Sequence, residues 1–176
     1  MELRTSDLFG GKTQENRNLL DNFGFLTRCC IPCIVQSYNK VQNTIECQPA
    51  IRERLINENN EVYYENLPLL VDVPVVFPQS SSFSIQFPLK KGDEVLVVFS
   101  DLAIDNFWKK GSIQNPVEYR RHDLSDGIAI PCILSQPKTK ICPNQLTIKS
   151  DTDITFEGSY GSFTGSQIYR LLHPNE

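Results

Sequence analysis

The segment from Glu94 to Phe99 constrains the fold most, because it is an apolar strand that follows a tight turn. Its last five residues are Val-Leu-Val-Val-Phe, which favour extended structure without a polar interruption. Such a run predicts a strand that is buried on both faces. Lys90 to Asp93 forms the preceding turn, in which Gly92 can adopt positive φ without steric cost. We therefore expect this strand to lie inside a closed or layered β structure.

A second strand is predicted immediately before that turn. Phe83, Ile85 and Phe87 alternate with Ser84 and Gln86, which is the period expected of a half-buried strand. The two segments together predict a β-hairpin, and we take this hairpin as the centre of a small β-barrel.

Further short strands are predicted on either side of this centre. Ser100 to Trp108 is expected to form a short helix or turn, with Trp108 closing one end of the barrel. Pro68 and Pro74 mark an edge, a bulge or a bend, because proline cannot donate to a ladder. This number of strands with one helical insert is typical of an oligosaccharide/oligonucleotide-binding (OB) barrel. The predicted strands are 31–38, 44–55, 61–65, 67–77 and 128–134.

Length and charge limit the functional classes. The 176 residues fit one domain with an appendage, and 40% apolar residues suffice for a core. The formal net charge of −4 disfavours nucleic acid as a partner, since phosphate-binding chains are usually basic. We find no signal peptide and no run approaching the roughly 18 apolar residues of a membrane span. We therefore expect synthesis in the cytoplasm without membrane insertion.

The six cysteines, at positions 29, 30, 33, 47, 132 and 142, are expected to be mainly buried, reduced thiols. Cys30 and Cys33 have the spacing of a zinc knuckle, but no second CxxC or HxxxH completes a tetrahedral site. The apolar residues that follow Cys33 favour a strand, whereas a redox CxxC motif precedes a helix.

The residues beyond Pro137 have a different character. Leu146 to Ile148 and Ile154 to Phe156 are one-sided apolar segments that start eight residues apart, and Ile168 to Leu172 is a third. Such a tail cannot build a core alone, so we expect other copies of the same segment to complete it. This implies a homo-oligomer. Ser166 to His173 fits a short amphipathic helix equally well.

Residues 1–27 are mainly polar, and five apolar side chains near their end are the ones that we expect to be available for burial. Two interpretations stay open: a flexible arm, or an arm that docks on a neighbouring chain. The apolar side chains are Leu19, Leu20, Phe23, Phe25 and Leu26.

Catalytic motifs are absent from the sequence. Ser125, His122, Asp123 and Asp126 could be assembled into a triad, but they lie in one polar loop without a GxSxG elbow. We expect the loop from Arg120 to Asp123 to be held by salt bridges and hydrogen bonds instead, with the basic pair Arg120 and Arg121 facing acidic neighbours. Nucleotide-binding glycine motifs and HExxH are also missing. We therefore predict a protein that is not an enzyme and has no cofactor.

Several segments resemble the N-terminal domain of the central spike proteins of contractile-tailed phages and phage-tail-like bacteriocins. They occur in the family's order and together span roughly residues 28–137. They are Ile31–Tyr38, Leu67–Phe77, Phe87–Phe99, Ile104–Trp108 and Arg120–Gly127.

The resemblance implies an OB barrel followed by a β-helical prism in which three chains intertwine. It also implies partners: a baseplate hub, tail-tube proteins, in some particles a separate tip protein, and transiently the target envelope. The expected location is the baseplate of a virion or tail-like particle assembled in the host cytoplasm. Two departures are visible in this chain. No lysozyme domain fits between Leu134 and Leu146, and His173 stands alone where some relatives carry iron-binding HxH pairs.

The prediction is an all-β homotrimer. Residues 1–27 form a hub-docking arm that uses the five apolar residues named above, 28–137 an OB barrel, and 138–176 a short trimeric β-prism or β-helical tip. His173 is a candidate metal ligand at the threefold apex. The rival prediction is an OB module that binds nucleic acid or glycan through exposed aromatic and basic residues. The expected tip-packing residues are Leu146, Ile148, Ile154, Phe156, Phe163, Ile168 and Leu172.

Overall fold

The structure is a computed structural model that describes residues 27–131, 133–139, 148, 150 and 152–174. The chain divides into two compact units, Met1–Lys138 and Thr139–Glu176. The first unit contains seven named strands, the helix α3 (Asp105–Lys110) and short 3-10 turns at Leu124–Asp126 and Gln136–Lys138. The strands are β1 (Cys30–Asn39), β2 (Thr44–Pro49), β3 (Glu53–Ile56), β4 (Val62–Glu65), β5 (Leu70–Pro74), β6 (Glu94–Phe99) and β7 (Gly127–Ile130).

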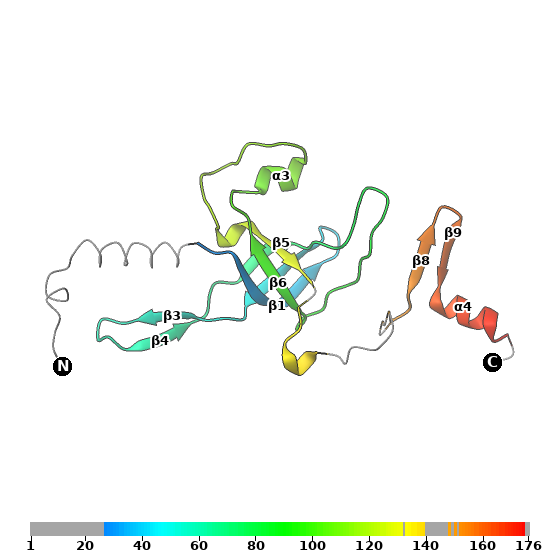
Figure 1. The fold of residues 1–176 in the computed structure, drawn as a ribbon, viewed down its shortest axis with the longest axis horizontal. Coiled ribbons are helices and arrows are strands. Elements are labelled where there is room, and N and C mark those ends of the chain that lie inside the picture. The colour runs from blue at the N-terminus through cyan, green and yellow to red at the C-terminus, as the bar shows by residue number, and fades with distance from the viewer. Residues whose placement is uncertain (1–26, 132, 140–147, 149, 151, 175–176) are drawn as a thin grey trace, which may run out of the picture. The chain divides into compact units, whose positions relative to one another are not determined.

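Five of these strands form one antiparallel sheet in the order β5-β2-β1-β6-β7. The sheet curls until its two outer strands meet (Figure 1). There Val75 and Ala129 form a parallel bridge, and the Val76 N–H donates to the Ala129 carbonyl at 2.9 Å. A five-stranded, partly open barrel is the architecture of OB folds. The predicted all-β barrel class is thus confirmed.

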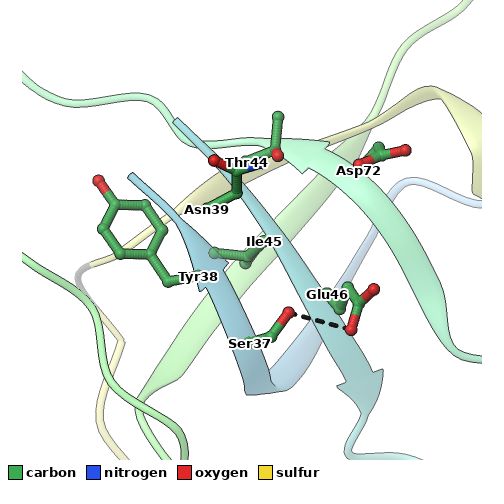
Figure 2. Close-up of a pocket in the computed structure, with 7 residues that line it drawn as sticks. All are labelled: Ser37, Tyr38, Asn39, Thr44, Ile45, Glu46 and Asp72. Carbon is green, nitrogen blue, oxygen red and sulfur yellow. Dashed lines mark hydrogen bonds between the residues drawn. The ribbon is translucent and has the colours of Figure 1, made fainter. Parts of the chain in front are cut away.

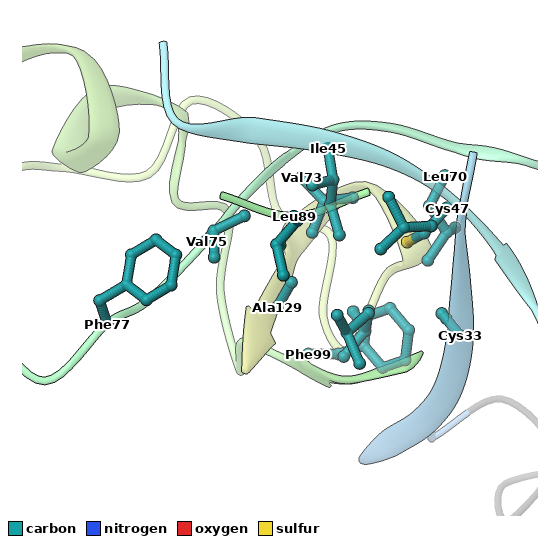
Figure 3. Packing of buried hydrophobic residues seen from close by; sticks show 13 residues of the cluster. Cys33, Ile45, Cys47, Leu70, Val73, Val75, Phe77, Leu89, Phe99 and Ala129 are labelled. Atoms are coloured by element: carbon teal, nitrogen blue, oxygen red, sulfur yellow. The ribbon is translucent and has the colours of Figure 1, made fainter. Parts of the chain in front are cut away.

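The inward faces of these strands form the hydrophobic core (Figure 3). On β6, Val95, Val97 and Phe99 are buried, while the alternate residues are half-buried. The prediction that both faces of this strand are buried therefore holds fully for one face only. The core also takes Cys33, Val35, Ile45, Cys47, Leu70, Val73, Val75, Phe77, Leu89 and Ala129.

The predicted hairpin between Phe83–Phe87 and Glu94–Phe99 is wrong. β6 pairs with β1 and β7, so both of its ladder edges are occupied. The β-pairing of the 83–87 segment is limited to an isolated bridge between Gln79 and Ser84. Phe83, Ile85 and Phe87 are exposed, although the Phe87 ring packs edge-on against Phe77. Prolines at 78 and 88 flank this segment, and each removes a backbone donor that a strand would need.

Three further predictions need correction. The expected continuous strand 44–55 is interrupted after Pro49, and its second part, β3, pairs with β4 in a separate hairpin. Trp108 does not close the barrel, because α3 has no buried residue and Trp108 is about half exposed. The strand predicted to end at Leu134 ends at Ile130, immediately before Pro131.

The second unit consists of the hairpin β8 (Thr155–Gly158) and β9 (Gly161–Thr164), followed by the helix α4 (Gly165–Leu172). The rings of Phe156 and Phe163 stack across the hairpin with centroids 5.4 Å apart. Thr164 and Gln167 form a reciprocal capping box at the start of α4. The open question about residues 166–173 is therefore settled in favour of a helix. Most of the predicted segment 146–148 lies outside the described residues.

Candidate assembly surfaces

Arg120 is the centre of a polar cluster that fastens the long connection between β6 and β7. Its Nε donates to Asp126 Oδ2 at 2.7 Å, its Nη2 to Asp126 Oδ1 at 3.1 Å, and it also pairs with Asp105 and Glu118. Asp126 is fully buried and additionally accepts the backbone N–H of Ile104 at 3.0 Å. The hydrogen bonds to Asp126 are the main reason that the Arg120 pKa is raised. The predicted ionic role of this loop is confirmed for Arg120.

His122 contacts the backbone just before β1 and the carboxylate of Asp101, and not a nucleophile. Its Nδ1 lies 3.1 Å from the carbonyl oxygen of Arg28, and its Nε2 lies 3.1 Å from Asp101 Oδ1. Asp123 instead accepts the N–H of Ser125 at 2.8 Å, which lowers the Asp123 pKa. Among the described residues, the structure therefore does not join His122, Ser125 and Asp126 into a triad.

The cysteines of the described residues divide into two exposed and two buried thiols. Cys29 and Cys30 are exposed, which corrects the expectation that the thiols are mainly buried. Cys33 and Cys47 lie in the barrel core, where a contact between their thiols and then burial raise the Cys47 pKa. Cys30 and Cys33 thus both lie on β1, but Cys30 is exposed to solvent and Cys33 is buried in the core. No metal-binding group of three or more side chains occurs within the described residues.

Two depressions on the described part of the barrel surface were considered as ligand sites. The first, about 210 Å³, is lined by residues at the β1–β2 and β5 bulges, with Ser37 Oγ donating to Glu46 Oε2 at 3.0 Å (Figure 2). The second, about 250 Å³, lies between Phe87, Glu94 and Ile133. Both volumes are below the range of roughly 300–1,000 Å³ that is typical of small-molecule sites. Surface contacts are therefore better candidates for function than either depression.

The β3–β4 hairpin is the first exposed apolar surface. Ile56 pairs with Val62 and Arg54 with Tyr64, so Ile56, Val62 and Tyr64 share one face, and all three are exposed. Leu55 and Tyr63 lie opposite each other on the other face. Neither strand contributes a fully buried side chain. The sequence analysis predicted strands over both segments of this hairpin, but it did not predict that the hairpin stands apart from the main sheet with apolar residues exposed on both faces.

A second exposed surface is built around α3 and the residues after it. Phe107 and Trp108 are exposed on the helix, and Ile113 is fully exposed in the following loop. Lys109 and Lys110 lie beside them and form no ion pair within the part of the chain that the structure describes. The arrangement therefore combines aromatic and basic side chains. Sequence analysis assigned Trp108 to the barrel and so overlooked this surface.

The C-terminal unit exposes the residues that were predicted to pack between chains. Ile148, Phe156, Phe163 and Leu172 are exposed, while Ile154 and Ile168 are half-buried. Asp153 accepts hydrogen bonds from the Ser166 hydroxyl and backbone N–H, which lower the Asp153 pKa and tie the hairpin to the start of α4.

Other predicted site residues are placed as follows. His173 ends α4, where its ring stacks on Tyr169 and its Nδ1 lies 3.1 Å from the Tyr169 carbonyl oxygen. Leu146 and the arm residues Leu19, Leu20, Phe23, Phe25 and Leu26 lie outside the described residues.

A comparison with known protein families identifies the family of this chain. Residues 31–132 match the model of the Phage protein Gp138 N-terminal domain. The chain belongs to this family.

The Gp138 N-terminal domain spans nearly the whole barrel, from the second residue of β1 to just beyond β7. The match supports a phage structural protein that is associated with the virion. No curated protein gives a significant match to the chain. Within the described residues, the structure contains no helix of the length and hydropathy needed to cross a membrane.

Proposed function

We propose that this protein is the central spike of a contractile injection particle, either a phage tail or a tail-like bacteriocin. Three chains would assemble at the baseplate centre, attach to the hub, and lead the tail tube through the target envelope when the sheath contracts. The role is mechanical rather than catalytic: sheath contraction supplies the work, and the spike supplies a rigid tip.

The observation that carries this proposal is the C-terminal unit. Its described residues include the stacked pair Phe156–Phe163 and the apolar residues Ile168, Leu171 and Leu172, yet none of these described residues is buried. A hairpin and a two-turn helix with no buried side chain lack the packing that stabilises small folds. Packing of three copies against one another supplies the missing apolar contacts. The phage family of the barrel supports a particle component as the setting.

A metal at the tip is a separate part of the proposal. Donation from His173 Nδ1 to the Tyr169 carbonyl leaves Nε2 as the atom available to a ligand. Three copies would present three such atoms around a threefold axis. The paired histidines of iron-binding relatives do not fit this chain, which has one histidine in the tail.

The deciding experiment is a mass measurement of the intact chain and of a variant lacking residues 142–176. The chain mass is 20.1 kDa, so a trimer has three times this mass. We expect a trimer for the intact protein and a weaker trimer or a monomeric barrel for the truncated one. A stable monomer formed by the intact chain would rule out the spike.

The N-terminal arm is assigned to the hub. Burying its five apolar side chains would contribute about 1.5–3 kcal/mol each, offset by about 1–2 kcal/mol per residue for ordering the backbone. The balance favours binding only where a partner supplies apolar surface. Removal of residues 1–26 should leave the trimer intact and reduce incorporation into particles. Normal incorporation of the truncated chain would contradict the assignment.

A further inference from the structure

The β3–β4 hairpin forms a sheet of its own and has two different faces (Figure 1). Cross-strand pairing defines the Tyr63 face, which consists of Glu53, Leu55, Tyr63 and Glu65. The same pairing defines the Tyr64 face, which consists of Arg54, Ile56, Val62 and Tyr64. Two short strands alone are marginally stable in water, and apolar side chains on both faces add unfavourable exposure. Further apolar contacts would therefore stabilise the hairpin.

The chain just before β1 meets the hairpin on the Tyr63 face. Arg28 Nη2 lies 3.4 Å from Oε1 of Glu53, the first residue of β3. The Arg28 carbonyl oxygen lies 3.1 Å from His122 Nδ1, and the Cys29 carbonyl accepts the Phe99 N–H at 2.9 Å, so the backbone of the same segment is bound to the barrel. The described chain therefore begins, at Thr27, beside the base of the hairpin.

The residues before Thr27 have the length and the composition to cover this face. Five extended residues, from Phe23 to Arg28, reach up to about 17 Å, and a strand of four residues such as β3 is about 13 Å long. Residues 19–26 contain five apolar side chains and one charged residue, Asp21. Attachment to the same chain also gives them a local concentration on the order of millimolar at their own hairpin.

We propose that residues 19–26 pack on the Tyr63 face of the hairpin in their own chain, with the rings of Phe23 and Phe25 nearest to Tyr63. The choice of this occupant follows from the Arg28–Glu53 contact, which brings the arm to this face and not to the Tyr64 face. The inference goes beyond the proposed spike function, which assigns the same arm to the hub. The hairpin holds the arm before assembly, and the hub then competes for its apolar residues.

Hydrogen exchange in the isolated full-length protein tests the contact. Phe23→Ser with Phe25→Ser should speed amide exchange in residues 53–65 by about tenfold or more, because the hairpin loses apolar contacts that oppose its opening. Exchange in β6 should stay at the wild-type rate, which shows that the barrel remains folded. Leu8→Ser with Phe9→Ser is the matched control, since it removes two apolar side chains from the arm outside residues 19–26.

Photocrosslinking identifies the face and the chain. Benzoylphenylalanine replaces Tyr63 in one variant and Tyr64 in the other, and peptide mapping locates the products. We expect crosslinks from position 63 to residues 19–26, within a chain that still runs at 20.1 kDa on a denaturing gel, and few from position 64.

Any of three results would overturn the proposal. The first is unchanged exchange in residues 53–65 after Phe23→Ser with Phe25→Ser. The second is a yield of crosslinks to the arm that is no higher from position 63 than from position 64. The third is a crosslinked product of twice the chain mass, which would assign the arm to a second copy. The mass measurement of the intact chain tests the spike separately, so failure of this contact leaves that proposal intact.

Discussion

Arg120 holds Asp126 through two nitrogens, Nε at 2.7 Å and Nη2 at 3.1 Å, while the carboxylate itself is fully buried. A planar guanidinium can make such a forked contact, whereas a lysine ammonium cannot. Asp126 also holds the Ile104 N–H, so one carboxylate connects the start of β7 with the segment that leads into α3. The pair therefore fixes both the barrel and the surface next to it.

Loss of Arg120 should destabilise the barrel strongly. Arg120→Met leaves a buried carboxylate without its cation, which typically costs about 3–5 kcal/mol. Chemical denaturation measures the change. Arg121→Met is the matched control, because Arg121 is exposed, and we expect a change within about 0.5 kcal/mol. Equal effects of the two substitutions would show that the fork does not stabilise the fold.

Gly127 should not tolerate a side chain while Val97 is present. A Cβ at position 127 would lie 2.8 Å from Val97 Cγ1 and 3.4 Å from Phe99 Cε1. We expect Gly127→Ala to cost about 1–3 kcal/mol through overpacking. Val97→Ala in the same chain should relieve part of this penalty, so the two losses should be less than additive. Gly158→Ala is the control, since a Cβ there meets nothing within 4 Å.

The four described thiols should react in two groups. Cys29 and Cys30 are exposed, so a maleimide should label both in the native protein. Cys33 and Cys47 are buried, and the raised Cys47 pKa further suppresses its thiolate, so both should react only after unfolding. Peptide mapping by mass spectrometry separates these positions from Cys132 and Cys142. Rapid native labelling of Cys47 would contradict the barrel core.

Acid should weaken the first unit through Asp123 and Glu94. The N–H of Ser125 lowers the pKa of Asp123, and the N–H of Ser135 followed by Lys138 lowers that of Glu94. A lowered folded-state pKa gives stability that is present above the unfolded-state value and is lost as pH falls through the folded-state value. The ordinary pKa values of these groups are 4.5 for Glu94 and 3.8 for Asp123. The loss of folding stability should therefore begin near these pH values and continue below them.

Substitution of the two acids isolates this effect. Asp123→Asn and Glu94→Gln should each flatten the fall in melting temperature across this pH range. Glu58→Gln, at an exposed position in the β3–β4 turn, should leave the slope unchanged. The idea fails if all three variants follow the wild-type profile.

The sequence predicted strands better than it predicted their partners. Ile31–Tyr38 lies within β1, and the apolar run after Glu94 is β6. Alternation at Phe83, Ile85 and Phe87 shows which side chains share a face, but it carries no information on whether anything packs against that face. Pairing is decided between segments far apart in the chain, so a nearby turn wrongly suggested a local hairpin.

The candidate surfaces were harder to predict for the same reason. Phe107 and Trp108 are as apolar as core residues, and only the fold reveals that they face outward. The Arg120–Asp126 pair was partly predictable, because a basic residue in a polar loop needs an acidic partner. The sequence did not show that Asp126 would be the buried acid. Asp126 is buried because it directly precedes β7, which lies in the barrel sheet.

Because the barrel closes through Val76 and Ala129, its segments can complete their pairing only in a certain order during translation. The two residues are separated by β6, α3 and the loop that holds Arg120, so the nascent chain cannot close its sheet until β7 has left the ribosome. Until then the outer edge of β5 is unpaired and open to association with other nascent chains. The hairpin β8–β9 pairs only neighbouring residues and can form within microseconds of emerging. Pairing within β8–β9 therefore needs no distant segment of the chain, whereas closure of the barrel sheet has to wait for β7.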